Sequence, residues 1–237
     1  YLSKLKPLLN IISNCKDDLN SYKITLNSLN SLKDRIRLVS VIRCKKDLIK
    51  DFKKAALPFK HKKIIFNSDS GLYNALNIAM NLVDKNLPFL CLHSGDLLFD
   101  KNKPFLIELL SKPMSKYSMY LFSTYLFNID YQNLKDLMEK PENSFYIKNF
   151  APREPKNYFI RRIYLFFSYN LHQSIIYSPE LNSLRFNENV GLAADILYNH
   201  KAYKISKKLV RFNKFLCFFN KNGLSSVSPI KEKIESR

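Results

Sequence analysis

The chain has 237 residues, of which 46% are hydrophobic and 14% aromatic, so it is long and apolar enough for one α/β domain and is not intrinsically disordered. Its formal net charge of +19 indicates an anionic partner such as a nucleic acid, acidic lipid headgroups or a phosphorylated substrate; the alternative is a solvated lysine-rich surface. No apolar segment reaches the roughly 18–20 residues that span a bilayer. The four cysteines form no CxxC pair, which indicates reduced thiols in a cytoplasmic protein.

The N-terminal part of the chain alternates between apolar runs and amphipathic stretches. This alternation predicts strands and helices that build a mostly parallel sheet with right-handed crossovers. Strands are expected at 8–13, 37–42, 64–66 and 88–92, and helices at 19–29, 46–56 and 71–82.

Polar or acidic side chains follow three of these predicted strands. Asn14 and Asp17 follow the first strand, Asp69 follows the third and Asp96 follows the fourth. Because ligands bind outside the carboxyl ends of strands in open parallel sheets, these groups are expected to converge on a binding site. The alternative for each carboxylate is that it only caps a turn or the next helix; Asp17 or Asp18 could cap the helix at 19–29. No GxGxxG or P-loop motif is present, which disfavours the dinucleotide-fingerprint and P-loop interpretations.

The pattern is less regular beyond residue 101. A helix predicted at 191–200 would bury Leu192, Ile196 and Leu197 and so place Asp195 beside apolar neighbours. A carboxylate in such surroundings is costly unless it is paired or used. Elsewhere we expect helices at 103–110 and 131–140, strands at 119–128, 172–177 and 203–210, a proline-containing loop at 141–156, and a polar tail at 230–237.

Five segments form a recognisable series: SDSGLYNALNIAM (68–80), FLCLHSGDLLF (89–99), HQSIIY (172–177), RFNENVGLAADI (185–196) and NGLSSVS (222–228). In order and spacing they resemble motifs of the inverting family-2 glycosyltransferases of the colanic-acid, capsule and O-antigen type. The resemblance implies a GT-A fold, which is a Rossmann-like α/β fold with a mostly parallel sheet flanked by helices and an irregular C-terminal half. It also implies a single domain at 1–229, with a nucleotide-sugar-binding half at about 1–100 and an acceptor-binding half at about 101–229.

The resemblance implies roles for individual residues. Asp195 resembles the catalytic base, and Asp96 resembles the ligand of a divalent metal, Mn²⁺ or Mg²⁺. His172 is a candidate for binding the diphosphate or the acceptor, although a satisfied core histidine is an equal alternative. The full set of candidate donor-binding residues is Asn14, Asp69, Gly71, Tyr73, Asn77, Ser94, Gly95, Asp96, His172 and Gln173.

The implied function is metal-assisted transfer of a sugar, with inversion, from a nucleotide-diphospho-sugar to a glycan or lipid-linked acceptor in bacterial surface polysaccharide synthesis. The basic clusters at 45–63 and 201–214 are expected to face an anionic membrane or glycan, at the inner face of the cytoplasmic membrane. Arg43 departs from the family pattern, because it stands where relatives have a base-reading Asp. Two alternatives therefore remain open: a catalytically degenerate scaffold and a basic nucleic-acid-binding protein.

Overall fold

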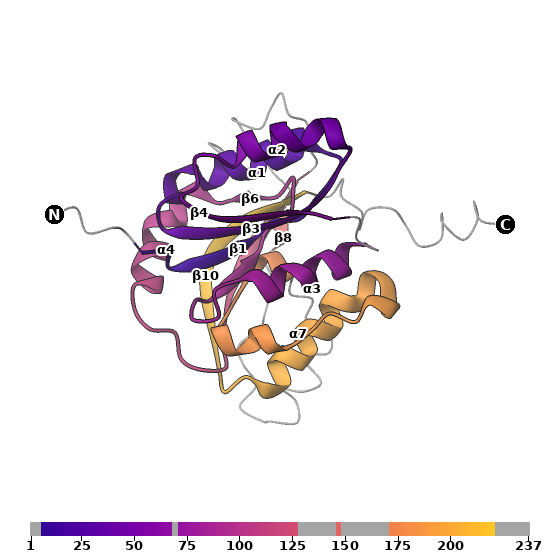
Figure 1. The fold of residues 1–237 in the computed structure, drawn as a ribbon. Helices are drawn as coiled ribbons and strands as arrows, with labels where there is room; N and C mark the ends of the chain where they lie inside the picture. Colours follow the sequence, from indigo (N-terminus) through magenta and orange to yellow (C-terminus); the bar gives the residue numbers. More distant parts are fainter. Residues whose placement is uncertain (1–5, 68–70, 128–145, 148–170, 221–237) are drawn as a thin grey trace.

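The computed structural model describes residues 6–67, 71–127, 146–147 and 171–220. These residues form one ten-stranded mixed sheet with helices on both faces, as Figure 1 shows. The strand order is β2-β3-β1-β5-β9-β7-β10-β6, with β4 paired to β3 and β8 paired to β7. The α/β fold class expected from the sequence is confirmed.

The N-terminal half of the sheet is parallel, as predicted. Strand β1 pairs in parallel with both β3 and β5, and β3 pairs in parallel with β4. All four residues of β1 are buried, which explains why three of them are apolar. The fourth, Asn10, donates hydrogen bonds to the backbone oxygens of Asp84 and Leu87. The strand bounds are β1 Leu9–Ile12, β2 Cys15–Lys16, β3 Ile36–Arg43, β4 His61–Phe66 and β5 Phe89–Cys91.

The C-terminal half of the sheet is mixed. Strand β9 pairs antiparallel with β5 and β7, whereas β10 pairs in parallel with β7 and antiparallel with β6. This arrangement brings the end of β10 beside the segment that follows β5. The strand bounds are β6 Leu97–Leu98, β7 Ser118–Phe127, β8 Tyr146–Ile147, β9 Ile175–Tyr177 and β10 Lys208–Asn220.

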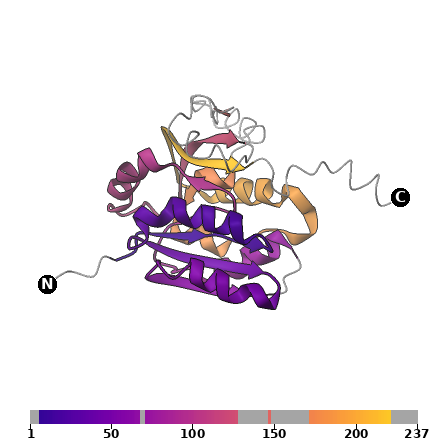
Figure 2. The ribbon, with the colours of Figure 1, turned by 90° about the horizontal axis from the view of Figure 1, so that it is seen from above.

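Each face of the sheet has its own core. Helices α1 and α2 cover one face, and α3 and α7 cover the other (Figures 1 and 2). The rings of Tyr22 and Phe52 pack 5.3 Å apart on the first face, and Tyr198 packs against Tyr177 on the second. Asp18 caps α1 by accepting a hydrogen bond from Ser21 N, as its position before the apolar stripe predicted. The helix bounds are α1 Leu19–Leu29, α2 Ile49–Ala55, α3 Leu72–Leu82, α4 Lys103–Leu110 and α7 Ala194–Ile205, and the 3₁₀ helices are η1 Asn30–Leu32, η2 Lys46–Leu48, η3 Asp100–Asn102, η6 His172–Ser174, η7 Pro179–Ser183 and η8 Glu188–Ala193.

The predicted burial of the 191–200 helix is wrong. Ile196 and Leu197 are 41% and 38% exposed, and α7 instead buries Ala194, Tyr198 and Ala202. Gly191 has a φ of 57°, which interrupts the segment, so the regular helix begins only at Ala194 and turns a different stripe toward the sheet. The Leu192 side chain lies outside the described residues.

Two further boundaries differ from the sequence expectation. His172 and Gln173 lie in the 3₁₀ helix η6, so the predicted strand at 172–177 is reduced to β9. The predicted strand at 203–210 also begins later, because α7 continues to Ile205. The helix expected at 131–140, most of the loop expected at 141–156 and the tail at 230–237 lie outside the described residues.

The four cysteines are free thiols, and Cys15, Cys91 and Cys217 are buried. The sequence prediction of unpaired cysteines is therefore confirmed. None of the helices in the described part of the chain has the length and hydrophobicity that crossing a bilayer requires.

Thr25 fastens α1 to the turn that follows β5. This threonine is fully buried, and its hydroxyl accepts a hydrogen bond from Gly95 N at 2.8 Å and lies 2.8 Å from the carbonyl oxygen of Asp96. The backbone of the turn after β5 is thus hydrogen-bonded by a side chain from a helix about 70 residues earlier.

We expect Thr25→Val to lower the free energy of unfolding by about 1–3 kcal/mol, because it removes the hydroxyl that accepts from Gly95 N and donates to Asp96 O. The Gly95 N–H would then keep only its longer hydrogen bond, of 3.2 Å, to Ser21 O. Urea unfolding measures the loss. Thr25→Ser is the matched control, since it keeps the hydroxyl and removes only a methyl group. Equal stability of the two variants would contradict this role for the hydroxyl.

Candidate functional site

The carboxyl ends of three strands meet at one place. After β1, Asn14 accepts a hydrogen bond from Val41 N of β3 through its side-chain oxygen, at 3.2 Å, and its backbone oxygen accepts from Ser94 N at 3.1 Å. Ser94 belongs to the tight turn after β5 that contains His93, Gly95 and Asp96. The expectation that polar groups at these strand ends converge is therefore confirmed for Asn14 and the Asp96 turn, whereas Asp69 lies outside the described residues.

Asp96 is a buried carboxylate, only 3% exposed. One oxygen accepts a hydrogen bond from His93 N at 3.2 Å, and the other accepts from Asn220 N at 3.1 Å. Burial raises the pKa of Asp96 to about 7, against the opposing effect of these backbone donors and of the Gln173 side chain. Asp96 therefore caps its own turn and also ties that turn to the end of β10.

Gly95 is required by its backbone conformation. Its φ of 95° is one that residues with a side chain rarely adopt, and a Cβ there would lie 3.0 Å from Asn220 Nδ2. The glycine thus allows the end of β10 to approach the turn closely enough for the Asn220 N–H to reach Asp96.

A chain of three side chains crosses the site. His93 Nε2 lies 2.7 Å from His172 Nε2, and His172 Nδ1 lies 3.4 Å from Asp195 Oδ2. Both imidazoles are enclosed, and desolvation, with the neighbouring His172, holds the pKa of His93 well below its usual value. Sequence reasoning misses the contact between His93 and His172, because no local pattern signals a contact between residues 79 positions apart.

Gln173, the neighbour of His172 in η6, contacts the other carboxylate. It is 3% exposed, and its side chain hydrogen-bonds Asp96 and thereby lowers the pKa of that carboxyl. Adjacent residues of one 3₁₀ turn therefore connect Asp195 on α7 with Asp96 after β5. The structure brings both candidate carboxylates to one site.

Several buried polar atoms in this region have no protein hydrogen-bond partner among the described residues. They are Ser13 Oγ, Asn14 Nδ2, His93 Nδ1 and Gln173 Oε1. A buried polar atom left without a partner destabilises a protein by about 1–3 kcal/mol, so native structures pair most of them with protein, water or ligand. Their concentration at the strand ends indicates a place where a polar ligand or ordered water completes the structure.

The candidate residues of α3 contact another part of the chain. Asn77 Nδ2 donates to Phe186 O at 3.0 Å and to Glu188 Oε1 at 2.8 Å, and Tyr73 stacks on the ring of Phe186. Gly71, with a φ of 141°, stands at the N-cap of α3. In the described structure these residues fasten α3 to the segment that leads into Asp195.

Asp96 fits the role of a single protein ligand for a divalent metal. Mg²⁺ and Mn²⁺ take hard oxygen ligands, and Mg²⁺ is often held by one or two carboxylates together with substrate phosphates. Asp96 accepts two backbone hydrogen bonds and one from the Gln173 side chain, which leaves one of about four carboxylate lone pairs for a metal. The described ranges contain no group of three or more His, Cys, Asp or Glu residues that would hold an ion alone, so other ligands would have to come from a bound substrate.

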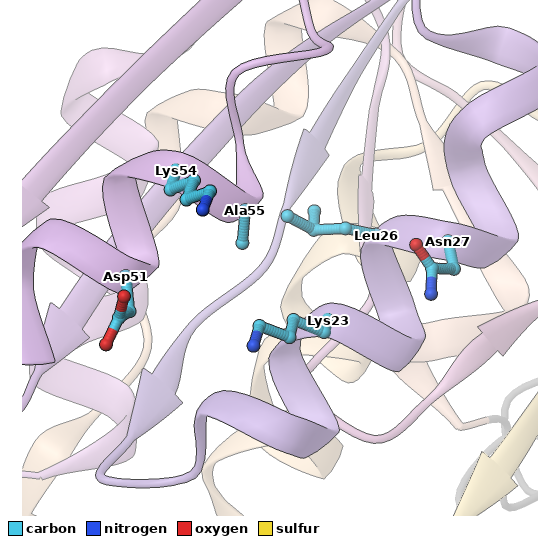
Figure 3. A pocket seen from close by; sticks show the side chains of 6 residues that line it. All are labelled: Lys23, Leu26, Asn27, Asp51, Lys54 and Ala55. Atoms are coloured by element: carbon cyan, nitrogen blue, oxygen red, sulfur yellow. The ribbon is translucent and has the colours of Figure 1, made fainter.

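The hollow drawn in Figure 3 is separate from this site. It lies between α1 and α2 and contains none of the candidate donor-binding residues. The residues that line the hollow are Lys23, Leu26, Asn27, Asp51, Lys54 and Ala55.

Arg43, at the end of β3, is exposed.

No protein-family model and no curated protein sequence matches the chain. Solved structures match its fold. TarS of S. aureus in complex with UDP has a TM-score of 0.67 and 16% identity, and the match covers 90% of this chain and 60% of that one. PcManGT, a mannosyltransferase from Pyrobaculum calidifontis in complex with GDP-Man and Mn²⁺, has a TM-score of 0.56 and 14% identity, with 93% and 59% covered.

A third match is glucosyl-3-phosphoglycerate synthase from Mycobacterium tuberculosis, in complex with Mn²⁺, UDP and phosphoglyceric acid. Its TM-score is 0.55, its identity is 12%, and the match covers 96% of this chain and 76% of that one. This chain spans about 60% of the length of the TarS and PcManGT chains. At these identities the matches establish the fold, so the chain has a GT-A-type fold.

We expect the stability difference between the wild type and Asp96→Asn to change with pH. The pKa of Asp96 is about 7 in the folded protein and 3.8 for an ordinary aspartate, so the folded state favours the proton. The stability from this group is fully present below about pH 4 and is lost as the pH rises through about 7, by roughly 3–5 kcal/mol. Asp96→Asn removes this loss.

Urea unfolding of both proteins between pH 4.5 and 8, with chelator present, measures the difference. Subtracting one curve from the other cancels the contribution of the histidines. Curves that stay parallel over this range would show that Asp96 ionises normally.

Proposed function

We propose that the protein is a glycosyltransferase that moves a sugar from a nucleotide-diphospho-sugar to a hydroxyl group of a glycan or lipid-linked acceptor, with inversion, in bacterial surface polysaccharide synthesis. One observation carries the proposal. In a GT-A-type fold, His172 and Gln173 link Asp195 to Asp96 at the strand ends, where several buried polar atoms have no partner among the described residues. The structures of similar fold that were solved with UDP or GDP-Man support a nucleotide donor.

The donor is proposed to bind the N-terminal half, about 1–100, at the ends of β1, β3 and β5. There Asn14 Nδ2 is a buried hydrogen-bond donor without a partner among the described residues, suited to an oxygen of the nucleotide-sugar. Asp96 would hold the metal, which when bound neutralises the charge that develops on the leaving diphosphate. Two of the structures with similar fold contain Mn²⁺, which supports this cofactor.

Asp195 is proposed as the base that takes the proton from the acceptor hydroxyl. It stands in the first turn of α7, which begins at Ala194. His172 holds Oδ2, and Ile196 N donates to Oδ1 at 2.8 Å. The side chain remains 13% exposed, so an acceptor held by the C-terminal half, about 101–229, can reach it.

The acceptor is proposed to lie on an anionic membrane that contacts the basic surface. In the first cluster Lys50, Lys53 and Lys54 on α2 are exposed, and Lys62 and Lys63 on β4 are exposed beyond them. Anionic lipids attract each such side chain with about 1 kcal/mol. This charge is also the feature that favours the nucleic-acid alternative.

Asp195→Asn should lower kcat by at least about 100-fold while leaving the Kd of the donor unchanged, because a general base acts on the acceptor proton and not on donor binding. Steady-state kinetics and calorimetry measure the two quantities. Asp51→Asn, on the exposed surface of α2, is the control. Normal turnover of the Asp195 variant would exclude Asp195 as the base.

Flotation on vesicles tests the membrane contact. The protein should bind vesicles that contain phosphatidylglycerol and not those of phosphatidylcholine alone, and the double variant Lys53→Glu/Lys54→Glu should bind at least about tenfold more weakly. Lys112→Glu, on an exposed residue outside the cluster, is the control. Equal recovery on both vesicle types would exclude this surface as a membrane contact.

A further inference from the structure

The contact between His93 and His172 restricts which ring nitrogens of the two histidines can carry a hydrogen. The proposed function does not require this restriction. Their Nε2 atoms lie 2.7 Å apart, a distance at which one nitrogen must donate and the other must accept. The rings meet edge-on, with centroids 4.9 Å apart and an interplanar angle of 65°. Only one hydrogen can therefore lie between the two Nε2 atoms.

The remaining nitrogen of His172 faces a carboxylate. His172 Nδ1 lies 3.4 Å from Asp195 Oδ2, a long contact of the kind that tightens when a site is occupied. An ionised carboxylate only accepts hydrogen bonds, so Nδ1 must carry a hydrogen to pair with it. A neutral His172 then has a bare Nε2, and the hydrogen between the rings belongs to His93.

The surroundings of His93 Nδ1 also support placing the shared hydrogen on His93 Nε2. His93 Nδ1 is buried and has no partner among the described residues. With Nε2 protonated, Nδ1 of a neutral imidazole is a lone pair, so no N–H is left unpaired in the interior. The other arrangement, in which His172 is a cation that donates through both nitrogens, would leave an N–H on His93 Nδ1 buried without an acceptor.

We propose that His93 and His172 form a positioning relay for Asp195, in which His93 Nε2–H donates to His172 Nε2 and His172 Nδ1–H donates to Asp195 Oδ2. Its mechanistic consequence rests on the proposed function, and the relay itself does not. His172 fixes the orientation of the carboxylate, and His93 fixes the tautomer of His172. Both are positioning residues, because they act through Asp195.

The tautomers are tested directly by long-range ¹H–¹⁵N correlation on the whole protein labelled with ¹⁵N-histidine, without any substrate. The chain contains His61, His93, His172 and His200, and spectra of His93→Gln and His172→Asn assign the two signals of interest. The expected result is His172 protonated on Nδ1 and His93 protonated on Nε2. A cationic His172, or a hydrogen on His93 Nδ1, would overturn the proposal.

Two matched variants test the consequence for turnover. In His172→Asn the amide nitrogen stands near the place of Nδ1 and can still donate to Asp195, whereas in His172→Gln the amide stands near the place of Nε2 and cannot. We expect kcat of the Gln variant to be at least about tenfold below that of the Asn variant, with the donor KM of the two alike, because a misplaced base slows the chemical step.

The correlation spectrum and the kinetics together distinguish failure of the relay from failure of the proposed function. Equal kcat for the two variants would show that His172 does not position Asp195. A difference confined to the donor KM would show in addition that His172 contacts the donor. The correlation spectrum decides the relay even if no sugar is transferred by any variant, since it is read on the wild-type protein. If the protein has the expected tautomers and no transferase activity, the proposed function fails and the relay stands.

Discussion

The organisation of this site depends on one buried carboxylate. Asp96 accepts hydrogen bonds from His93 N in its own turn and from Asn220 N at the end of β10, which lies 124 residues away. A buried carboxylate is tolerated only where it is hydrogen-bonded, so its position fixes the distance between the two elements. The parallel half of the sheet and the mixed half are thereby joined at the strand ends.

The two candidate carboxylates have different surroundings, which suits them to different tasks. Asp96 is 3% exposed and enclosed by backbone donors, whereas the Asp195 side chain is 13% exposed at the start of a helix. In the proposed function, Asp96 would hold the metal and Asp195 would meet the acceptor from outside. His172 and Gln173 relate the two because they are neighbours in one rigid turn. This separation of tasks is the strongest reason to prefer transfer chemistry over nucleic-acid binding.

Local signals in the sequence predicted the local structure well. Patterns within a few residues predict the buried strand β1, the Asp18 cap of α1 and the place of Asp96 after β5. Long-range features did not follow. The pairing of β6 with β10 and the contact of His93 with His172 depend on how distant segments meet, and no periodicity contains that information. The buried face of α7 was predicted incorrectly because Gly191 delays the start of the helix and shifts the stripe that faces the sheet.

The central claim is that these strand ends bind a nucleotide-diphospho-sugar. Calorimetry with a panel of UDP-, GDP- and dTDP-sugars, each with Mn²⁺, with Mg²⁺ and with chelator, tests it most directly. We predict that one nucleotide class binds and that binding needs the metal. We also predict that Arg43 takes the place of the usual Asp beside the nucleobase and so changes which base is recognised. If folded protein binds no member of the panel under any of these conditions, the claim is wrong, and the degenerate-scaffold and nucleic-acid alternatives take its place.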